Sequence, residues 1–326
     1  MKKRHGLIGI IISVACVALA LRGVDFHGLA NTIKTSQYQI LPVTITIYIF
    51  GYVLRTLRWR MILSPLKIID LRRTYHVIMI AWTANNLLPA RLGEIIRAYL
   101  IGKSESISRS ASFATIIVER VLDGIALIGA LAILLLLYPF PAWARNVGAI
   151  GTVAFLGAIA FLLSLYIWRE QTLRLFRRLT TWLPDKTQQF ILINFEKFLS
   201  GLQFLKDGVK ALQCLGLSLC IWGIEAVVYY MFFHIVGLNL PFYAAVFTLV
   251  IVNMGIIIPS SPGYVGTYQV FAILALAVFG IDKTHALGYA VLLHGMIYLV
   301  VTGLGFISMQ RLGMQWGDLS KVDMDS

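Results

Sequence analysis

Six long apolar stretches constrain the fold of this chain more than any other feature. A helix needs about 20 predominantly apolar residues to cross the hydrocarbon core of a bilayer. Stretches of that kind lie near residues 6–22, 39–57, 120–138, 147–168, 211–236 and 285–309. We therefore predict an all-α, polytopic membrane helix bundle with about six full crossings. It would form a single integral membrane domain over residues 1–310, followed by a cytoplasmic tail at 311–326.

The composition agrees with a membrane location and excludes other classes of protein. Of the 326 residues, 59% are hydrophobic and 13% are charged, whereas about a quarter of the residues of a soluble domain are charged. The three cysteines, Cys16, Cys214 and Cys220, all lie in apolar stretches, which argues against both a disulfide framework and a zinc site. The chain is therefore not expected to be a soluble enzyme, a disordered protein or a coiled coil.

Two further apolar stretches, 75–101 and 242–280, are interrupted by Pro, Gly, Asn or charged residues. Cytoplasmic loops of membrane proteins carry an excess of Lys and Arg. Nearly all Lys and Arg fall in cytoplasmic segments if each broken stretch is a re-entrant hairpin, which enters and leaves on the same side. A full crossing by either stretch would invert everything after it and remove this asymmetry. We therefore predict two re-entrant hairpins. The protein would lie in the plasma (inner) membrane, with both chain termini in the cytoplasm.

These hairpins give the chain an inverted repeat, with halves at about 39–138 and 211–309. In each half, a crossing is followed by a hairpin and a second crossing, but the second hairpin enters from the opposite face. The halves are joined by a polar, cytoplasmic, amphipathic connector at 169–210. This connector is predicted to lie on the anionic membrane surface or to form a solvated loop helix, and the sequence leaves both open.

Paired broken segments in inverted halves indicate a transporter binding site near the middle of the membrane. Non-helical backbone is tolerated there only when it is buried in protein or lines a hydrated cavity. The half-helices that begin after Pro89 and Pro259 would also present free N–H groups, which suit an anionic group such as phosphate.

Charged residues accompany these breaks. Glu94 and Arg97 share one helix face, and Arg91 lies a turn before them. Charges at membrane depth are costly and normally face a bundle interior or a hydrated cavity. We expect such charges to line a cavity, although structural ion pairs are the alternative. Further charges of this kind lie at Glu119, Arg120, Asp123 and Glu225.

Other polar residues are open to simpler interpretations. Arg55 and Arg58 lie at the end of a crossing, where they could extend to the cytoplasmic headgroups or join the cavity. His234 and His294 are expected to be packed, hydrogen-bonded side chains. No His or Cys cluster has metal-ligand spacing, and Gly102-Lys103-Ser104 lacks the preceding glycine of a P-loop. We therefore predict neither a cofactor nor an enzymatic activity, and no nucleic-acid partner.

The sequence resembles the lysylphosphatidylglycerol synthase transmembrane-domain family from about the first helix to residue 310. Three motifs carry the resemblance: Asn86-Leu-Leu-Pro89-x-Arg91-x-Gly93-Glu94-x-x-Arg97, Glu119-Arg120-Val-Leu-Asp123 and Pro259-x-x-Pro262-Gly263-x-x-Gly266. The resemblance implies movement of a lipid between leaflets. In members fused to a synthase domain, that lipid is an aminoacylated phospholipid.

We therefore expect a lipid flippase or a transporter of a phospholipid or lipid-linked substrate. The alternative is a membrane-embedded lipid-modifying enzyme or the membrane subunit of a lipid glycosyl or aminoacyl transferase. A separate synthase or glycosyltransferase and a second copy of the chain are possible partners. The candidate substrate-binding residues are Asn86, Pro89, Arg91, Glu94, Arg97, Glu119, Arg120, Asp123, Glu225, Pro259, Gly263, Gly266 and Gln269.

Overall fold

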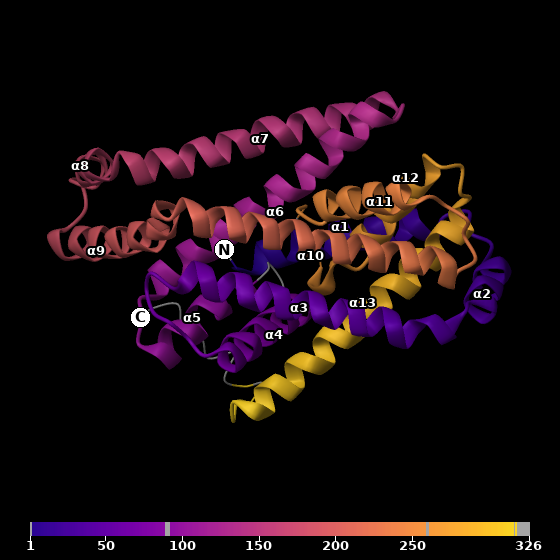
Figure 1. Ribbon diagram of the computed structural model, residues 1–326, viewed down its shortest axis with the longest axis horizontal. Coiled ribbons are helices and arrows are strands. Elements are labelled where there is room, and N and C mark those ends of the chain that lie inside the picture. The colour runs from indigo at the N-terminus through magenta and orange to yellow at the C-terminus, as the bar shows by residue number, and fades with distance from the viewer. Residues whose placement is uncertain (1, 89–91, 259–260, 316, 318–326) are drawn as a thin grey trace.

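The computed structural model describes residues 2–88, 92–258, 261–315 and 317, and all regular elements in this part of the chain are helices (Figure 1). Five of these helices are long and apolar enough to cross a membrane. The predicted polytopic helical bundle is therefore confirmed. The five helices are α3 (Leu41–Leu63), α6 (Arg109–Leu137), α7 (Ala142–Ile167), α10 (Gly208–Ile235) and α13 (Lys283–Arg311).

The N-terminal stretch differs from the simple crossing predicted near 6–22. Helix α1 (Lys2–Leu21) is followed after a short break by α2 (Phe26–Thr35), whose axis is turned by 87° from that of α1. Asp25 begins α2 because its side chain accepts a hydrogen bond from the backbone N–H of His27. Helix α2 was not predicted. The bent pair adds a sixth span only if α1 and α2 together form one crossing of the membrane.

The first broken stretch forms a helical hairpin. Its arms are α4 (Leu71–Leu87) and α5 (Gly93–Glu105). The open ends of the arms are joined by an ion pair of 2.7 Å between Arg73 and Glu105. The arms therefore run antiparallel, and the chain returns to the end at which it started.

The second broken stretch reverses in the same way. Its arms are α11 (Phe242–Gly255) and α12 (Thr267–Ala277), with the short helix η4 (Pro262–Tyr264) between them. The rings of Phe247 and Phe279, at the open end of this hairpin, have centroids 5.8 Å apart. Both predicted chain reversals are therefore present in the structure.

The two hairpins point toward each other from opposite ends of the bundle. The open end of the first lies beside the start of α6, where the Arg109 guanidinium lies 4.5 Å from the Tyr99 ring. The open end of the second lies at the other end of α6, where Tyr243 stacks on Tyr138. The tips meet, because a Cβ on Gly263 would lie 3.1 Å from the backbone oxygen of Asn86.

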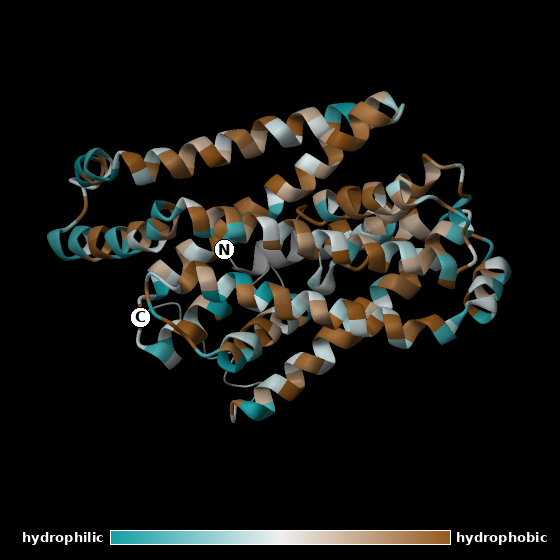
Figure 2. Cartoon of the chain, viewed as in Figure 1, coloured by the Kyte–Doolittle hydropathy of each residue, from teal (hydrophilic) through white to brown (hydrophobic). Residues whose placement is uncertain are grey.

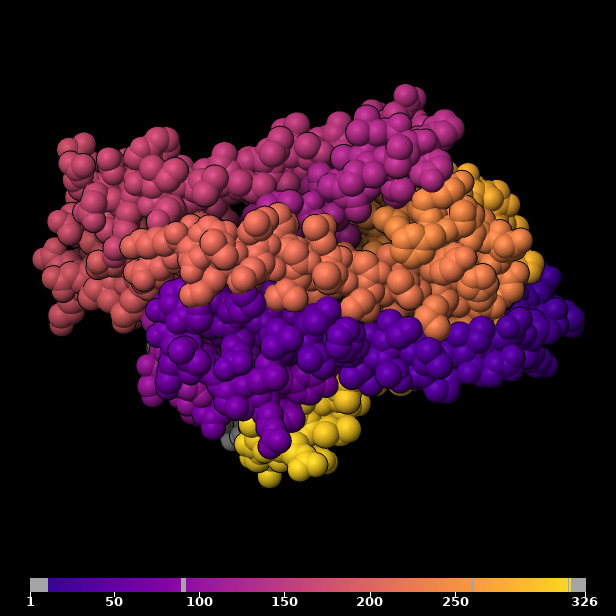
Figure 3. Space-filling model, in the orientation of Figure 1, coloured from indigo at the N-terminus to yellow at the C-terminus, as the bar shows by residue number. Residues whose placement is uncertain are grey.

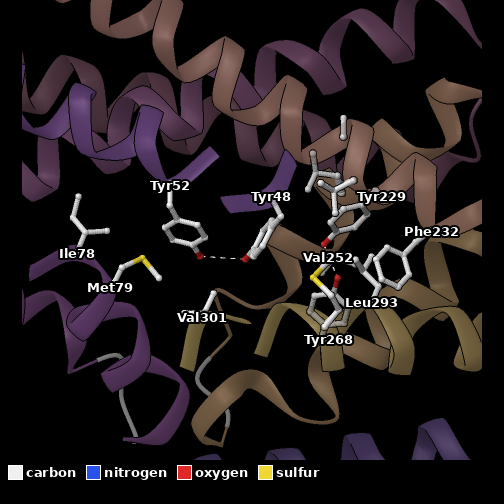
Figure 4. Packing of buried hydrophobic residues seen from close by; sticks show 14 of the residues in the cluster. Tyr48, Tyr52, Ile78, Met79, Tyr229, Phe232, Val252, Tyr268, Leu293 and Val301 are labelled. Carbon is white, nitrogen blue, oxygen red and sulfur yellow. Dashed lines mark hydrogen bonds between the residues drawn. The ribbon is translucent and has the colours of Figure 1, made fainter. Parts of the chain in front are cut away.

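The largest group of buried side chains lies between the two halves. Tyr48 and Tyr52 of α3 share a hydrogen bond, and Tyr268 of α12 donates one to Tyr229 of α10 (Figure 4). In a bilayer, helix association depends on such packing and hydrogen bonding rather than on exclusion from water. One pair of phenols lies in the first half and the other in the second half, and α10 packs against α3 between them.

Helix α7 and the connector lie at the edge of this bundle. Only 11% of the apolar window of α7 is buried. Most of its residues are hydrophobic (Figure 2), and Ile150, Val153 and Phe161 are among those exposed. In Figure 3, α7 forms the upper edge of the visible face. The connector contains α8 (Arg169–Leu179), α9 (Asp185–Gly201) and the short helix η3 (Leu202–Lys206). The two amphipathic stretches predicted there are thus helical.

Candidate functional site

Eight charged side chains from four helices come together inside the bundle. We name them the charge cluster. Glu119, near its centre, lies about 15 Å along α6 from Arg109, at 1.5 Å per residue. The cluster holds equal numbers of Arg and acidic residues, as expected where charges are removed from water. Its members are Arg55, Arg58, Glu94, Arg97, Glu119, Arg120, Asp123 and Glu225.

Arg97 binds the first hairpin to α6. Its two terminal nitrogens donate hydrogen bonds of 2.9 and 2.8 Å to the two oxygens of Glu119. This two-point geometry is the strongest arrangement of an Arg–carboxylate pair. The Arg97 guanidinium also lies 3.7 Å from the centroid of the Trp59 ring, which favours a cation–π contact. Arg97 and Glu119 are both almost completely buried.

Arg58 binds α3 to α6 and α10. It donates hydrogen bonds to Asp123 and to the hydroxyl of Ser218, and its side chain is fully buried. Asp123 also accepts a hydrogen bond of 3.0 Å from the indole of Trp222. Arg58 therefore joins α3 to α6 through the Asp123 carboxylate and to α10, in the second half, through the Ser218 hydroxyl.

Arg55 forms an ion pair with Glu225 on α10. Its guanidinium also lies within 6 Å of three aromatic rings, those of Tyr52, Trp82 and Trp222. The partner of Glu225, which the sequence did not specify, is thus Arg55. Because Trp222 contacts both Arg55 and Asp123, this pair is continuous with the rest of the cluster.

One edge of the charge cluster is accessible. The side chains of Arg120 and Glu94 are 32% and 29% exposed, and their charged groups lie 3.8 Å apart. Arg120 also contacts Glu119 at 2.7 Å and Asp123 at 3.4 Å. It therefore links the accessible edge to the buried acids.

Several buried donors in the cluster have no hydrogen-bond partner among the described residues. They include Nη1 of Arg55, Nε of Arg97 and Nε of Arg120. A buried donor without a partner costs free energy. These nitrogens thus retain hydrogen-bonding capacity that the described side chains do not use.

The tip of the first hairpin is held by its asparagines. Asn85 accepts a hydrogen bond of 2.9 Å from the backbone N–H of Gly93, and Asn86 donates one of 3.0 Å to Thr302 of α13. Asn85 thus occupies the N–H of Gly93, whereas the binding of an anionic group by the remaining N–H groups of this arm stays a prediction.

The tip of the second hairpin is shaped by two glycines and an amide. Gly263 and Gly266 adopt φ values of +67° and +90°, which favour glycine because it lacks a Cβ. Gln269 accepts a hydrogen bond of 2.8 Å from the N–H of Gly266 and contacts His294. The first N–H of this arm is thus occupied as well. A substrate-binding role for Gly263, Gly266 and Gln269 stays a prediction.

The structure brings together only part of the predicted site. Glu94, Arg97, Glu119, Arg120, Asp123 and Glu225 all belong to the charge cluster, while Asn86 lies at the meeting point of the hairpin tips. Pro89, Arg91 and Pro259 lie outside the described residues.

Sequence reasoning left open whether Arg55 and Arg58 belong to the site, and it missed the aromatic residues around them. The two arginines are 5% and 0% exposed, so the interpretation that they extend to the headgroups is wrong. The available signal was their spacing of three residues, which places both on one helix face, next to Trp59. Trp82 and Trp222 had no signal that distinguished them from interfacial aromatic residues.

The fold and the charge cluster define a polytopic helical membrane protein with two opposed hairpins and a buried, paired set of charges. The chain belongs to the family described as the lysylphosphatidylglycerol synthase transmembrane region, which it matches over residues 6–305. The resemblance found in the sequence is therefore confirmed. No solved structure matches the chain.

Related proteins are known from archaea. Glycosyltransferase AglD of Haloferax volcanii is 26% identical over 91% of this chain and 53% of its own length. The chain thus spans about half the length of that relative. A UPF0104 membrane protein of Methanothermobacter thermautotrophicus is 22% identical over 95% of the chain and 96% of its own length. UPF0104 membrane protein MJ1078 of Methanocaldococcus jannaschii is 28% identical over 68% of the chain.

Proposed function

We propose that this protein moves a phospholipid or lipid-linked substrate between the leaflets of the membrane. The observation that carries the proposal is the accessible edge of the charge cluster, at Arg120 and Glu94, beside the first hairpin. A buried ion-pair network with no access would serve only to hold helices together. Because the side chains of Arg120 and Glu94 are each about one-third exposed, a charged lipid headgroup can reach them and replace one of the two as the partner of the other.

The exchange follows from the chemistry of Arg120. A lipid phosphate would replace Glu94 as a partner of the guanidinium and form charge-assisted hydrogen bonds with it. Because Glu119 and Asp123 also contact Arg120, the arginine stays anchored during the exchange. Glu94 would then be free to pair with a cationic group on the same headgroup. The acyl chains would remain in the lipid beside the bundle.

The two hairpins supply the conformational change. Repeats that are inverted relative to each other can rock about a fixed site, which exposes that site first to one leaflet and then to the other. Asn86 and Gly263 meet at the hairpin tips, so this contact would open and close during rocking. We further propose that both hairpins are re-entrant and that both termini lie in the cytoplasm, at the plasma membrane.

Glu94→Gln tests the transport proposal. Purified protein is reconstituted into vesicles that contain a fluorescent phospholipid, and the fraction of lipid that reaches the other leaflet is followed by quenching. We expect Glu94→Gln to slow translocation by about tenfold or more, which equals roughly 1.4 kcal/mol. Glu105→Gln is the matched control, because Glu105 lies on the same helix but at the open end of the hairpin. Equal rates for both variants would refute the site.

A second candidate function is suggested by the name of one relative. Because AglD is named as a glycosyltransferase, this chain could be the membrane part of a lipid-modifying enzyme or of a transferase complex. Paired acids such as Glu94 and Glu119 would then act as general acid and base. Mass spectrometry of the vesicle lipids distinguishes the two functions, since transport leaves the lipid chemically unchanged. We favour transport and, with it, a protein that is not an enzyme.

A further inference from the structure

The turn of the second hairpin is tied to a buried histidine that the proposed transport mechanism does not use. His294 lies on α13 and is 7% exposed. Its Nδ1 atom lies 3.0 Å from Nε2 of Gln269, and the ring also hydrogen-bonds to the backbone of Gly263. Both partners belong to the segment that forms the turn and the start of α12.

The hydrogen bonds fix the orientation of the Gln269 amide. The backbone N–H of Gly266 donates to Oε1 of Gln269 at 2.8 Å. Because Oε1 is the acceptor there, the other end of the amide is Nε2, which can only donate. Gln269 therefore donates to His294, and Nδ1 of His294 must be an unprotonated acceptor. The ring proton is thus on Nε2.

This arrangement cannot accommodate a second proton on His294. A protonated imidazole has two N–H donors and no acceptor, so Nδ1–H would face the donor Nε2 of Gln269. If the Gln269 amide rotated to offer Oε1 to the imidazolium, its NH2 group would then face the N–H of Gly266. One buried hydrogen bond is lost in either case. Protonation of His294 therefore costs either its own bond to Gln269 or, if the amide rotates, the bond that holds Gly266.

The other groups around the imidazole do not compensate for this conflict. Tyr268 of α12 stacks on the ring at 4.2 Å, and Tyr298 of α13 meets it edge-on at 6.5 Å. The Tyr268 hydroxyl is directed to Tyr229 of α10 (Figure 4). The side chains that α1 and α4 bring to this turn, Ser13 and Asn86, are neutral. The contacts described for the ring thus include no carboxylate to stabilise an imidazolium.

The turn is closely packed and lies against the first hairpin. Gly266 has φ +90°, and a Cβ there would lie 2.7 Å from the backbone oxygen of Ser13 on α1. Gly263, three residues earlier, lies against Asn86 at the tip of the first hairpin. A change in the hydrogen bond to Gly266 therefore acts directly on the place where the two hairpins meet.

We propose that His294 is a proton-binding site, and that binding a proton there releases the 263–266 turn from Gln269 and separates the two hairpin tips. Nδ1 takes the proton from hydronium in the surrounding water, so one N–H bond forms, one O–H bond breaks and a water molecule is released. The site is independent of which substrate the protein carries. In a transporter, this site would link the separation of the hairpin tips to the proton concentration on the side of the membrane from which the turn is accessible.

Two measurements on the purified full-length protein test the proposal without any transport assay. Nitrogen-15 NMR of histidine-labelled protein shows which ring nitrogen carries the proton, and His294→Gln identifies the His294 signals. Spin labels at Val265 and Leu299, which are 46% and 72% exposed, report the distance from the turn to α13. These labels are attached to cysteines introduced in a background without the native cysteines. Both measurements are made from about pH 7.5 down to about pH 3.5, which extends below the range in which ordinary histidines titrate.

In the wild-type protein we expect Nδ1 of His294 to be unprotonated at neutral pH and to gain a proton on acidification. The spin-label distance should change over the same pH range. His294→Gln can both donate and accept, so it should keep the neutral arrangement and abolish the distance change. The matched control is His285→Gln, which removes an exposed histidine from the start of the same helix and should leave the change intact.

Gln269→Glu separates a proton site from a merely structural histidine. A carboxylate at this position can accept from the Gly266 N–H and from protonated His294 at the same time. We therefore expect His294 to be protonated at neutral pH in Gln269→Glu while the turn stays closed. The proposal is overturned if wild-type His294 never gains a proton in this range, or if the spin-label distance still changes with pH in His294→Gln.

Discussion

Arg97 on the first hairpin and Glu119 on α6 form a bidentate ion pair that is almost completely buried. This pair anchors a helix that starts in the middle of the bundle to a helix that runs its full length. Arg120, the next residue after Glu119, carries the same network to the accessible edge. The pair that stabilises the hairpin is therefore continuous with the residues proposed to contact the substrate.

Loss of the Glu119 charge should destabilise the protein strongly. In Glu119→Gln, Arg97 loses its counter-charge while it stays buried, and breaking such a pair costs about 3–5 kcal/mol. We expect a clear decrease in the thermal unfolding temperature of the detergent-solubilised protein. Glu196→Gln is the matched control, because the Arg169–Glu196 pair is exposed and such a pair contributes about 1 kcal/mol or less. Equal stability of the two variants would contradict the assigned burial.

The close approach of the two arms of the first hairpin should not tolerate a side chain at Gly93. A Cβ at this position would lie 1.9 Å from the backbone oxygen of Ala81, and backbone atoms cannot move away without separating the arms. Gly93→Ala should therefore lower the free energy of unfolding by about 1–3 kcal/mol. Gly223→Ala, in the middle of α10 with no heavy atom within 4 Å, should be neutral or stabilising. Thermal unfolding of both variants provides the comparison.

The open end of the first hairpin should respond to acid. A hydrogen bond from Lys67, together with Arg73, lowers the pKa of Glu105 below its ordinary value. The stabilisation by Glu105 is therefore fully present above that ordinary value and is lost as the pH falls through the lowered folded-state pKa. Since Lys67 and Arg73 are both about half exposed, the effect should be about 1 kcal/mol or less.

Unfolding temperatures of wild type and Glu105→Gln, measured from neutral pH to about pH 3.5, check this expectation. The difference between the two proteins should shrink as the pH falls. Glu170→Gln, at an exposed position on α8, controls for the substitution itself. A difference that stays constant over the whole range would show that the charge of Glu105 does not stabilise the hairpin.

The topology can be tested by the accessibility of single cysteines. Both arms of the first hairpin should open on the cytoplasmic face, so cysteines at the exposed positions Arg72 and Lys103 should be labelled from the same side. A cysteine at the exposed Asn239, between α10 and α11, should be labelled from the opposite side. Labelling of Arg72→Cys and Lys103→Cys from different faces would show that the hairpin is a full crossing.

The sequence by itself determined most of the elements, although not α2, and their general arrangement. Apolar stretches of membrane-crossing length and the distribution of Lys and Arg predict a bundle with two interrupted segments, and both segments reverse as expected. These features are predictable because hydropathy and helix-breaking residues determine the structure of a single segment, without contacts to distant parts of the chain. The same local signals identified Glu94, Glu119, Asp123 and Glu225 as charges that face the bundle interior or a hydrated cavity.

Only the tertiary structure decided which groups are partners. Arg55 and Arg58 lie near the end of an apolar stretch, a position that suits both a headgroup contact and a buried pair. Packing of α3 against α6 and α10 removes these arginines from water, so each must pair with a carboxylate on another helix. The link between Gln269 and His294, 25 residues apart, likewise depends on α12 lying against α13. Such contacts join positions that are distant in sequence, and no local pattern encodes them.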